Sequence, residues 1–395
     1  MGDPLTIWYV FYESPGIMPA HVHEVVSHFL AAGQRVVLFA RAHAPGGPLD
    51  ALAEKGAELV CLDVPDVRGL AEPLFLAALA RELGRRLRGE RPDAVYARHS
   101  GASAAVVAAV RGRAPVILEV NDVVTAKARF AGVYRIKAAW IRVYETFAFP
   151  RADLVLPVTP GIRQWIVDAF PVDPDRVRVV ENGVDDRRFS PMDQAACREK
   201  FGLPAEGTIA GFLGSFYAWA GLETLVDAAP DILREFPDIL FALGGGEEPY
   251  FSRICGLVEA RGLSGSFAFF GRVPYEDAPA FINAMDLCLD PANFPDPGTG
   301  IAAQKDMACL ACAKPLVGSD IRGLGDMLEQ AGAGVSFAMG DPADLARAVK
   351  QVLADPAAMR EMGRRGRKAA EARSWRVQTD RIADMIRELA GKARA

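Results

Sequence analysis

Short apolar segments alternate with amphipathic segments along almost the whole chain, and this rhythm limits the possible folds more than any other feature. Apolar runs of strand length, such as residues 5–12 and 34–40, are followed by longer stretches in which apolar residues recur every three or four positions. Such alternation predicts a parallel sheet covered by helices on both faces. With a hydrophobic share of 51%, it indicates a globular α/β protein.

The rhythm runs through two series, and 395 residues are too many for one hydrophobic core. We therefore expect an N-terminal domain at residues 1–185 and a second domain at 186–374. The last segment, 375–395, is expected to form a helix that packs back on the first domain. The predicted strands of the first series are 5–12, 34–40, 58–62, 92–96, 115–120, 152–157 and 176–180, and those of the second are 209–213, 239–244, 266–270, 287–289 and 315–318.

Charge and cysteine usage limit the function classes. The formal net charge of −5 gives no reason to expect bulk nucleic-acid binding. The six cysteines are dispersed and lie mostly in apolar segments, which favours free thiols and a cytoplasmic location over a disulfide framework. Cys309 and Cys312 form a CxxC pair without a second pair, so we expect them to pack in the core.

Nine segments between residues 32 and 320, from AGQRVVLFA to AKPLVGSD, follow one another in an order that resembles that of the retaining glycosyltransferases of family 4. The resemblance implies a GT-B fold, in which two Rossmann-like doubly wound parallel-sheet domains face an interdomain cleft. It also implies transfer of a sugar from a nucleoside-diphosphate sugar of the UDP or GDP type to an acceptor. The nucleotide would bind the second domain and the acceptor the first, with no metal or other cofactor. The segments are AGQRVVLFA, PDAVYARHS, APVILEVND, RADLVLPVTPGIRQWI, VRVVENGVDDRRFSP, FLGSFYAWAGLETLVDAA, GGGEEPYF, FFGRVPYEDAPAFINAMDLCLDP and AKPLVGSD.

Four positions depart from the family's donor site. Ser215 and Ala220 stand where the family carries an Arg and a Lys that hold the donor phosphates, and Gly300 and Ala308 stand where it carries two glutamates. A degenerate donor site leaves two other functions open. One is a divergent relative that uses a different donor or is a catalytically silent binding protein. The other is a sugar-nucleotide epimerase of the same fold.

Donor-side candidates lie in glycine-rich turns. Thr299, Gly300 and Ile301 lead into a helix expected at 302–312, and Lys305 lies near its start. Free N–H groups at a helix start beside a cation favour an anion, and a diphosphate would fit, although a solvated helix lysine is the alternative. Further candidates in similar turns are Gly214, Ser215 and Trp219, with Gly16 of the first loop added by the resemblance.

Acceptor-side candidates lie where two predicted neighbouring strands end. Arg98 and His99 follow one strand, and Glu119, Asn121 and Asp122 end the next. A buried glutamate is costly without a partner, so Glu119 must either pair with a group such as Arg98 or serve the reaction. The catalytic group is not identified by the sequence, and its candidates are His99, Glu119 and Asn121.

His21 is also assigned to the acceptor side. It follows the first loop, together with His23 and Glu24, and a metal site would need a third ligand that only His99 could supply.

A basic segment in the first domain offers a possible membrane contact. Residues 81–142 hold thirteen Arg or Lys and five Asp or Glu, and aromatic residues recur at helical spacing within 126–147. Such a segment fits either a peripheral contact with an anionic membrane surface, and hence a lipid-linked acceptor, or a core-facing stripe with a solvated face. A small-molecule acceptor stays open as well.

Overall fold

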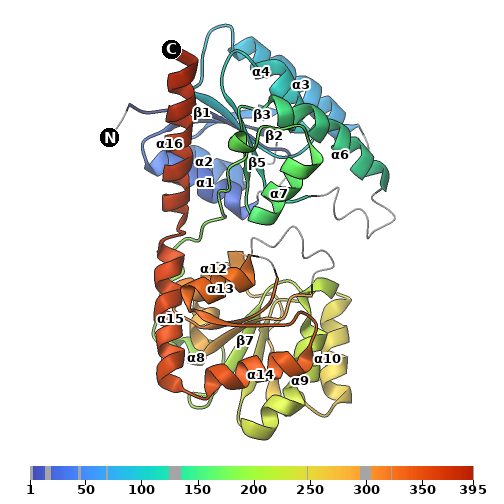
Figure 1. Cartoon of the computed structure of the whole chain (residues 1–395), viewed down its shortest axis with the longest axis vertical. Coiled ribbons are helices and arrows are strands. Elements are labelled where there is room, and N and C mark those ends of the chain that lie inside the picture. The colour runs from blue at the N-terminus through green and yellow to red at the C-terminus, as the bar shows by residue number, and fades with distance from the viewer. Residues whose placement is uncertain are drawn as a thin grey trace. The chain divides into compact units, whose positions relative to one another are not determined.

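The chain folds into two compact units, seen in a computed structural model (Figure 1). One unit combines Met1–Asn182 with Trp375–Ala395, and the other is Gly183–Ser374. The structure describes residues 3–13, 19–42, 46–67, 70–123, 135–246, 248–293, 304–321 and 323–394.

The first unit is built on a six-stranded parallel sheet with the order β3-β2-β1-β4-β5-β6. The chain starts in the middle of the sheet, winds outward to one edge and then crosses back to the other. This doubly wound order brings the carboxyl ends of β1 and β4 together at a switch point, where such sheets bind ligands. The strands are β1 (Thr6–Val10), β2 (Arg35–Arg41), β3 (Glu58–Leu62), β4 (Ala94–Arg98), β5 (Val116–Val120) and β6 (Leu154–Pro157).

Helices cover both faces of this sheet. On one face α1 (Ala20–Ala31), α2 (Pro48–Glu54) and α16 (Trp375–Arg394) share a core with the strands, so the C-terminal helix belongs to the first unit. Elsewhere α3 (Ala71–Arg86), α4 (Ala102–Val110) and α6 (Arg135–Ala148) pack side by side (Figure 1). The unit also contains α7 (Pro160–Ala169), which begins where Thr159 Oγ1 accepts a hydrogen bond of 3.0 Å from Ile162 N.

The second unit repeats the same winding. Its parallel sheet has the order β12-β11-β10-β7-β8-β9, which is again first strand central, next two to one side, last three to the other. The strands are β7 (Ile209–Leu213), β8 (Leu240–Gly244), β9 (Phe267–Phe269), β10 (Leu287–Asp290), β11 (Leu316–Ser319) and β12 (Gly334–Phe337). The helices are α8 (Gln194–Lys200), α9 (Leu222–Glu235), α10 (Tyr250–Ala260), α11 (Ala278–Ala284), α12 (Gln304–Ala311), α13 (Leu324–Ala331), α14 (Pro342–Leu353) and α15 (Pro356–Glu371).

Two segments differ from the sequence prediction. Residues 176–180 are predicted to form a strand, but they form no regular strand. They run beside β6, with one bridge between Val155 and Val177 and hydrogen bonds from Arg178 N to Val155 O and from Val180 N to Pro157 O. The 3-10 turn Pro174–Arg176 occupies the start of this segment and shortens the pairing. The sixth strand of the second sheet, β12, was not predicted, because GVSF is short and only its last residue is buried.

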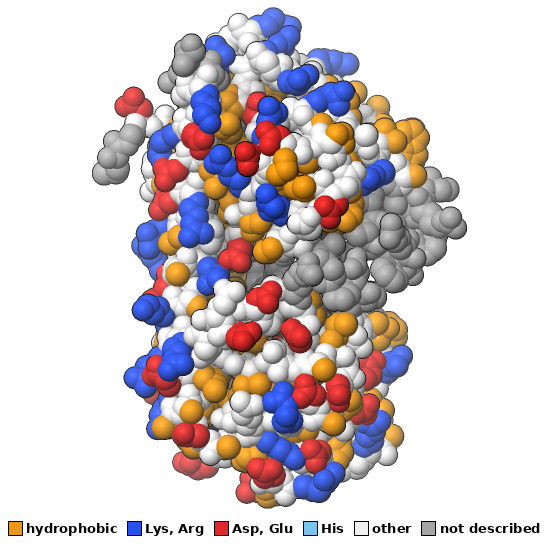
Figure 2. Space-filling model, viewed as in Figure 1, with side chains coloured by type: hydrophobic (Ala, Val, Ile, Leu, Met, Phe, Trp, Pro, Cys, Tyr) orange, Lys and Arg blue, Asp and Glu red, His pale blue; other side chains and the backbone are white. Residues whose placement is uncertain are grey.

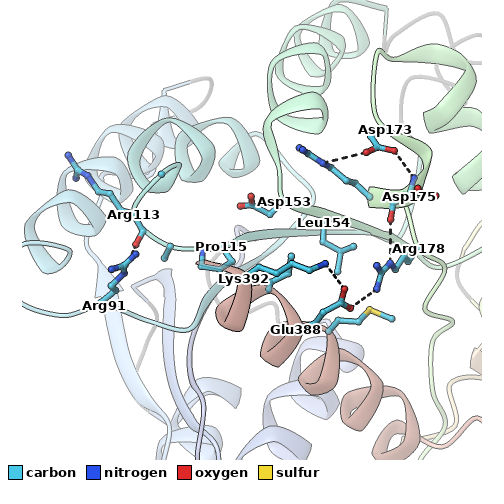
Figure 3. Close-up of a pocket in the computed structure, with 15 residues that line it drawn as sticks. Arg91, Arg113, Pro115, Asp153, Leu154, Asp173, Asp175, Arg178, Glu388 and Lys392 are labelled. Atoms are coloured by element: carbon cyan, nitrogen blue, oxygen red, sulfur yellow. Dashed lines mark hydrogen bonds and ion pairs between the residues drawn. The ribbon is translucent and has the colours of Figure 1, made fainter. Parts of the chain in front are cut away.

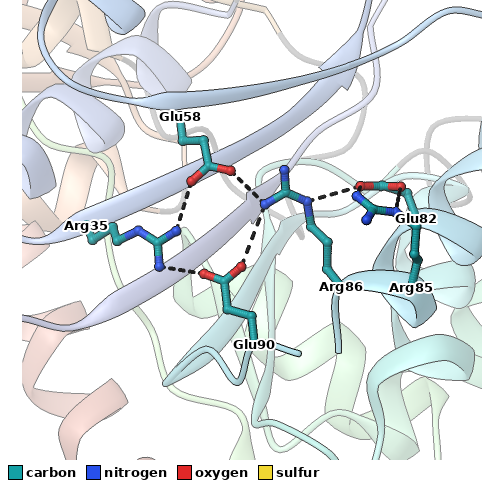
Figure 4. A network of polar contacts seen from close by, with 6 residues as sticks. All are labelled: Arg35, Glu58, Glu82, Arg85, Arg86 and Glu90. Atoms are coloured by element: carbon teal, nitrogen blue, oxygen red, sulfur yellow. Dashed lines mark hydrogen bonds and ion pairs between the residues drawn. The ribbon is translucent and has the colours of Figure 1, made fainter. Parts of the chain in front are cut away.

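Ion pairs between charged side chains connect the amino ends of β2 and β3 to the end of α3 (Figure 4). Arg35 of β2 donates to Glu58 of β3 at 2.9 Å, and Arg86 of α3 donates to the same carboxylate at 2.6 Å. Arg86 also contacts Glu82 and Glu90. These contacts are largely exposed, so their effect is to fix the position of α3 more than to add stability.

In the described part of the chain, no helix is both long and apolar enough to cross a membrane. All six cysteines are free, as the sequence predicted. Cys309 and Cys312 are buried in the core of the second unit.

Candidate functional site

Glu119 is the centre of a polar cluster at the carboxyl edge of the first sheet. It lies on β5 and is 5% exposed. Tyr96 of β4 donates a hydrogen bond of 2.6 Å from its hydroxyl to Glu119 Oε2, and Asn121 donates from its amide to Oε1. His21 Nε2, at the start of α1, lies 3.2 Å from the same Oε1. Three elements thus converge on one carboxylate.

These partners decide the charge of Glu119. Burial alone would raise the pKa of this carboxyl, but the His21 imidazole and the hydrogen bonds from Tyr96 and Asn121 lower the pKa to about 2. Glu119 is therefore ionised at neutral pH. Burial and the adjacent Glu119 carboxylate in turn raise the pKa of the Tyr96 phenol well above its usual value.

Arg98 and His99 do not join this cluster. Arg98 forms an ion pair with Glu13, so it is not the partner of Glu119 that the sequence suggested. His99 lies among the helices, with Nε2 3.3 Å from Glu145 Oε1 of α6 and Nδ1 3.4 Å from Ser103 Oγ. Its side chain is 5% exposed and packs against Phe149.

Asp122 and His23 have contacts of their own. Asp122 is half-buried and its carboxylate accepts a hydrogen bond of 2.7 Å from Val123 N. His23 contacts Glu24 and Lys55. His21, His23 and His99 thus have different partners, and among the described residues no group of three or more His, Cys, Asp or Glu is placed to hold a metal ion.

The loop after β7 forms the second candidate site. Gly214 and Ser215 follow the strand, and Ser215 is exposed. Trp219 is 49% exposed, and its ring centroid lies 4.6 Å from that of Tyr217. Gly221, the N-cap of α9, has φ of +68°, and a Cβ there would lie 1.8 Å from Pro291 O. Only glycine fits this close contact between two loops.

Lys305 of α12 lies against the same loop. Its Nζ is 2.7 Å from Asp290 Oδ1 and 4.6 Å from the centre of the Phe212 ring. Its aliphatic stem is close to Gly214, where an added Cβ would lie 3.5 Å from Lys305 Cδ. Burial lowers the pKa of Lys305, but Asp290 and Asp306 outweigh this effect and raise it, so the ammonium is charged.

Two buried acids at this site were not recognised in the sequence. Asp290 ends β10 and is 2% exposed, and Asp306 in the first turn of α12 is equally buried. Burial and the neighbouring Asp290 carboxylate raise the pKa of Asp306 well above its usual value. The signal for Asp290 was present, because an acid at the end of an apolar strand is what singled out Glu119.

The structure therefore brings some predicted residues together and separates others. Glu119, Asn121 and His21 form one group in the first unit, and Lys305, Gly214 and Ser215 lie near one another in the second. The predicted donor residues that fall outside the described part of the chain are Gly16, Thr299, Gly300 and Ile301.

A cavity of about 540 Å³ lies at the opposite, amino edge of the first sheet (Figure 3). It is bounded by Leu154 at the start of β6 and by Glu388 and Lys392 of α16. Glu388 accepts from Arg178 at 3.1 Å and from Lys392 at 2.8 Å. These contacts join α16 to the chain after β6, and the cavity lies at the end of the sheet opposite the Glu119 cluster.

The fold defines the class of protein. Over 98% of its length the chain superposes on HepE of Anabaena in complex with UDP, with a TM-score of 0.79, 18% identity and 100% of that chain covered. Sucrose-phosphate synthase from Thermosynechococcus elongatus gives a TM-score of 0.77 at 20% identity, covering 98% of this chain and 100% of that one. The fold is GT-B, with two Rossmann-like domains.

Two family models then identify the family. The model described as Glycosyltransferase Family 4 matches residues 18–188, and the model described as Glycosyl transferases group 1 matches residues 193–369. The chain belongs to glycosyltransferase family 4.

Curated relatives agree over part of their length. A 2-deoxystreptamine glucosyltransferase of Streptomyces kanamyceticus is 30% identical over 220 residues, which are 55% of this chain and 53% of that protein. The matches to the first curated relatives span about half of those relatives' length.

Proposed function

We propose that the protein transfers a sugar from a UDP- or GDP-type sugar nucleotide to an acceptor, with retention at the anomeric carbon. Membership of the glycosyltransferase family supports the reaction class. Within this proposal the nucleotide binds the β7 loop of the second unit, and the Glu119 cluster of the first unit contributes to the acceptor side. We assign no metal or other cofactor to the reaction.

The observation that carries the donor assignment is the position of Lys305. Its aliphatic stem is close to Gly214 of the β7 loop, and its charged Nζ lies over the Phe212 ring of β7. The loop leads through Gly221 into α9. The start of α9 has no side-chain cap, so its N–H groups and the helix dipole favour an anion. A diphosphate carries the charge that this combination binds, and the exposed Trp219 offers a surface for a base or sugar.

Similar proteins support a sugar nucleotide as the donor. The HepE structures are complexes with UDP and with UDP-glucose. The curated relatives include glucosyl and other glycosyl transferases. The location that we propose is the cytoplasm, where the six free cysteines would stay reduced.

Lys305 compensates in part for the missing phosphate ligands at Ser215 and Ala220. A charge-assisted hydrogen bond contributes about 1.5 to 3 kcal/mol. Asp290 Oδ1 already lies 2.7 Å from Lys305 Nζ, so a diphosphate must share the ammonium with Asp290 or displace this carboxylate. We therefore expect the contact of Lys305 with the diphosphate to contribute the lower end of that range, about 1.5 kcal/mol, which is roughly a tenfold gain in affinity.

The test is calorimetric titration of the full chain with UDP, GDP, UDP-glucose and a GDP-sugar. At least one nucleotide should bind, and Lys305→Ala should weaken it at least tenfold. Lys200→Ala is the matched control, because Lys200 forms an equally short pair with Asp277 elsewhere in the same unit. Unchanged affinity in Lys305→Ala would remove this lysine from the donor site.

The four altered donor positions favour one alternative, a catalytically silent GT-B protein that binds a partner. The same titrations discriminate between the two functions. If none of these nucleotides binds and a protein partner binds tightly, the result supports the silent protein. Slow release of free sugar from a bound sugar nucleotide would support the transferase.

A further inference from the structure

Helix α6 carries an exposed apolar stripe. Trp140, Val143 and Phe147 are 61%, 59% and 37% exposed. Their spacing of three and four residues places them on one face of the helix. Large apolar side chains at this exposure are common singly, but three in line on one helix form a continuous patch, which marks a binding surface.

The opposite face of α6 already anchors the helix. Glu145 and Ala148 are buried, and Glu145 lies 3.3 Å from His99 Nε2. α6 also packs beside α4. Among the described residues, the stripe is therefore not part of the core of the first unit. The sequence left open a membrane contact and a core-facing stripe, and α6 has a buried inner face that includes Glu145 and an exposed apolar outer face.

The charges of this segment are almost all positive. Between the start of α6 and Arg151 the sequence holds four cations, Arg135, Lys137, Arg142 and Arg151. Arg142 is bound at the end of α7, where it donates to Ala169 O and lies over the Phe170 ring. The one acid in that range is Glu145, which is buried. The Arg151 guanidinium lies over the Phe147 ring, 4.6 Å from its centre, so a cation borders the stripe itself.

We propose that the α6 stripe binds an anionic lipid surface. Tryptophan and phenylalanine insert at the boundary of headgroups and acyl chains, and a cation beside them, here Arg151, binds an anionic headgroup. A second copy of the chain fits less well, because an isologous contact through α6 would place these cations against their own copies. The contact lies in the described part of the segment 126–147; residues 126–134 lie outside it.

A second set of exposed apolar residues lies in the same helical layer. Leu70, Leu74 and Val67 are between 42% and 55% exposed, next to or within α3, and α3 packs beside α4 as α6 does. Six of the ten large hydrophobic residues exposed in the described part belong to this layer. In Figure 2 hydrophobic side chains gather at the upper right, where Figure 1 places α3 and α6.

Docking at a membrane would also narrow the acceptor class. This step rests on the proposed function, since a transferase held at a lipid surface is suited to an acceptor carried by a lipid. Lipid binding itself needs no nucleotide, and nucleotide binding needs no vesicle. The two proposals can therefore fail separately.

The test is flotation of the full chain with vesicles of phosphatidylcholine alone or with one third phosphatidylglycerol. We expect binding to the anionic vesicles and weaker binding as salt increases. The variant Trp140→Ala/Val143→Ser/Phe147→Ala should reduce the partition coefficient at least tenfold. Its fold should be retained, because all three side chains are exposed, and far-ultraviolet circular dichroism and thermal unfolding check this.

Tyr275→Ala is the matched control for the triple variant. Tyr275 is 46% exposed and carries Arg188 over its ring, like Phe147 and Arg151, but it belongs to the other unit. This variant should bind vesicles as the unchanged chain does. The proposal is overturned by absence of binding to anionic vesicles at low salt or by equal binding of the triple variant. Sedimentation showing a dimer that only the triple variant breaks would assign the stripe to a second copy instead.

Discussion

At the scale of single residues, Glu119 shows how a buried charge is held. A carboxylate taken out of water needs partners for its lone pairs, and Glu119 obtains them from Tyr96, Asn121 and His21. The partners come from β4, the end of β5 and α1, so the contacts also fix the relative positions of these elements. Removing the carboxylate would leave three polar groups without their common acceptor.

This arrangement predicts a pH-dependent stability. The folded pKa of Glu119, about 2, lies below its ordinary value of 4.5, so the ionised group stabilises the fold above pH 4.5. That contribution falls as the pH drops from 4.5 toward 2. The difference corresponds to roughly 3 kcal/mol at neutral pH, at about 1.4 kcal/mol per pH unit. Glu119→Gln should lower the free energy of unfolding by about this amount at pH 7 in urea titrations, and by progressively less below pH 4.5.

Glu388→Gln is the control for that measurement. The pKa of Glu388 is also about 2, because Lys392 and Arg178 donate hydrogen bonds to it, but the group is exposed to solvent. Water and salt screen such a pair, so its loss should change stability much less. Equal losses in both variants would contradict the role of burial at Glu119.

The residue scale also shows what sequence reasoning can identify at the site. The need of Glu119 for a partner followed from its place on an apolar strand, but the choice between Arg98 and His21 depended on side-chain directions that spacing does not give. Asp306 was missed for a different reason. An acid in the first turn of a helix usually interacts with the helix dipole in solvent, and only the packing around α12 shows that this one is buried.

At the scale of elements, Gly221 joins the loop after β7 to the loop after β10. Its φ of +68° is unfavourable for other residues, and Pro291 O occupies the place of a Cβ. Asn293 N donates a hydrogen bond of 2.8 Å to Trp219 O beside this contact. The start of α9 is thus held against the end of β10.

Gly221→Ala should separate these two loops. The clash is with backbone, which yields little, so we expect a loss of about 2 kcal/mol or more in the free energy of unfolding. Affinity for the bound nucleotide should fall as well, because the N–H groups at the start of α9 move. Gly256→Ala in α10 is the control: nothing lies within 4 Å of its Cβ position, and alanine should add up to about 1 kcal/mol. Wild-type stability in Gly221→Ala would show that the loops relax freely.

Strands were predicted best where an apolar run has clear ends in the sequence. The segments 58–62 and 209–213 match β3 and β7 to the residue, because both are apolar runs with clear ends. β12 has three half-buried residues of four, so its sequence lacks the apolar run that marks an inner strand. Residues 176–180 have the composition of a strand, but the proline turn at Pro174–Arg176 includes their first residue, and their pairing with β6 is short.

At the scale of the whole molecule, the two-unit GT-B architecture followed from the repeated strand-helix rhythm and the order of motifs, and the structural similarity confirms the fold. Strand order within each sheet does not follow from that rhythm alone. It depends on where each crossover packs, and the doubly wound order is one of several that short right-handed connections allow. The donor residues around 294–303 lie outside the described part of the chain, so their assignment stays a prediction.

The composition of the first unit leads to a prediction for the whole chain, because α16 completes that unit from the far end of the sequence. Trp375, Ile382 and Ile386 are at most 5% exposed in the core that α16 shares with the first sheet. Burying three such side chains contributes roughly 5 to 9 kcal/mol, which is comparable to the whole stability of an ordinary domain. Deleting residues 375–395 should therefore unfold the first unit and leave the second folded.

Calorimetry and limited proteolysis measure this outcome. The shortened chain should lose one thermal transition and yield a protease-resistant fragment near residues 183–374. Deletion of residues 392–395 alone is the control, because it leaves every buried residue of α16 in place. If the shortened chain shows no thermal transition at all, the two units fold only together. If it keeps two transitions, the core of the first unit does not need α16.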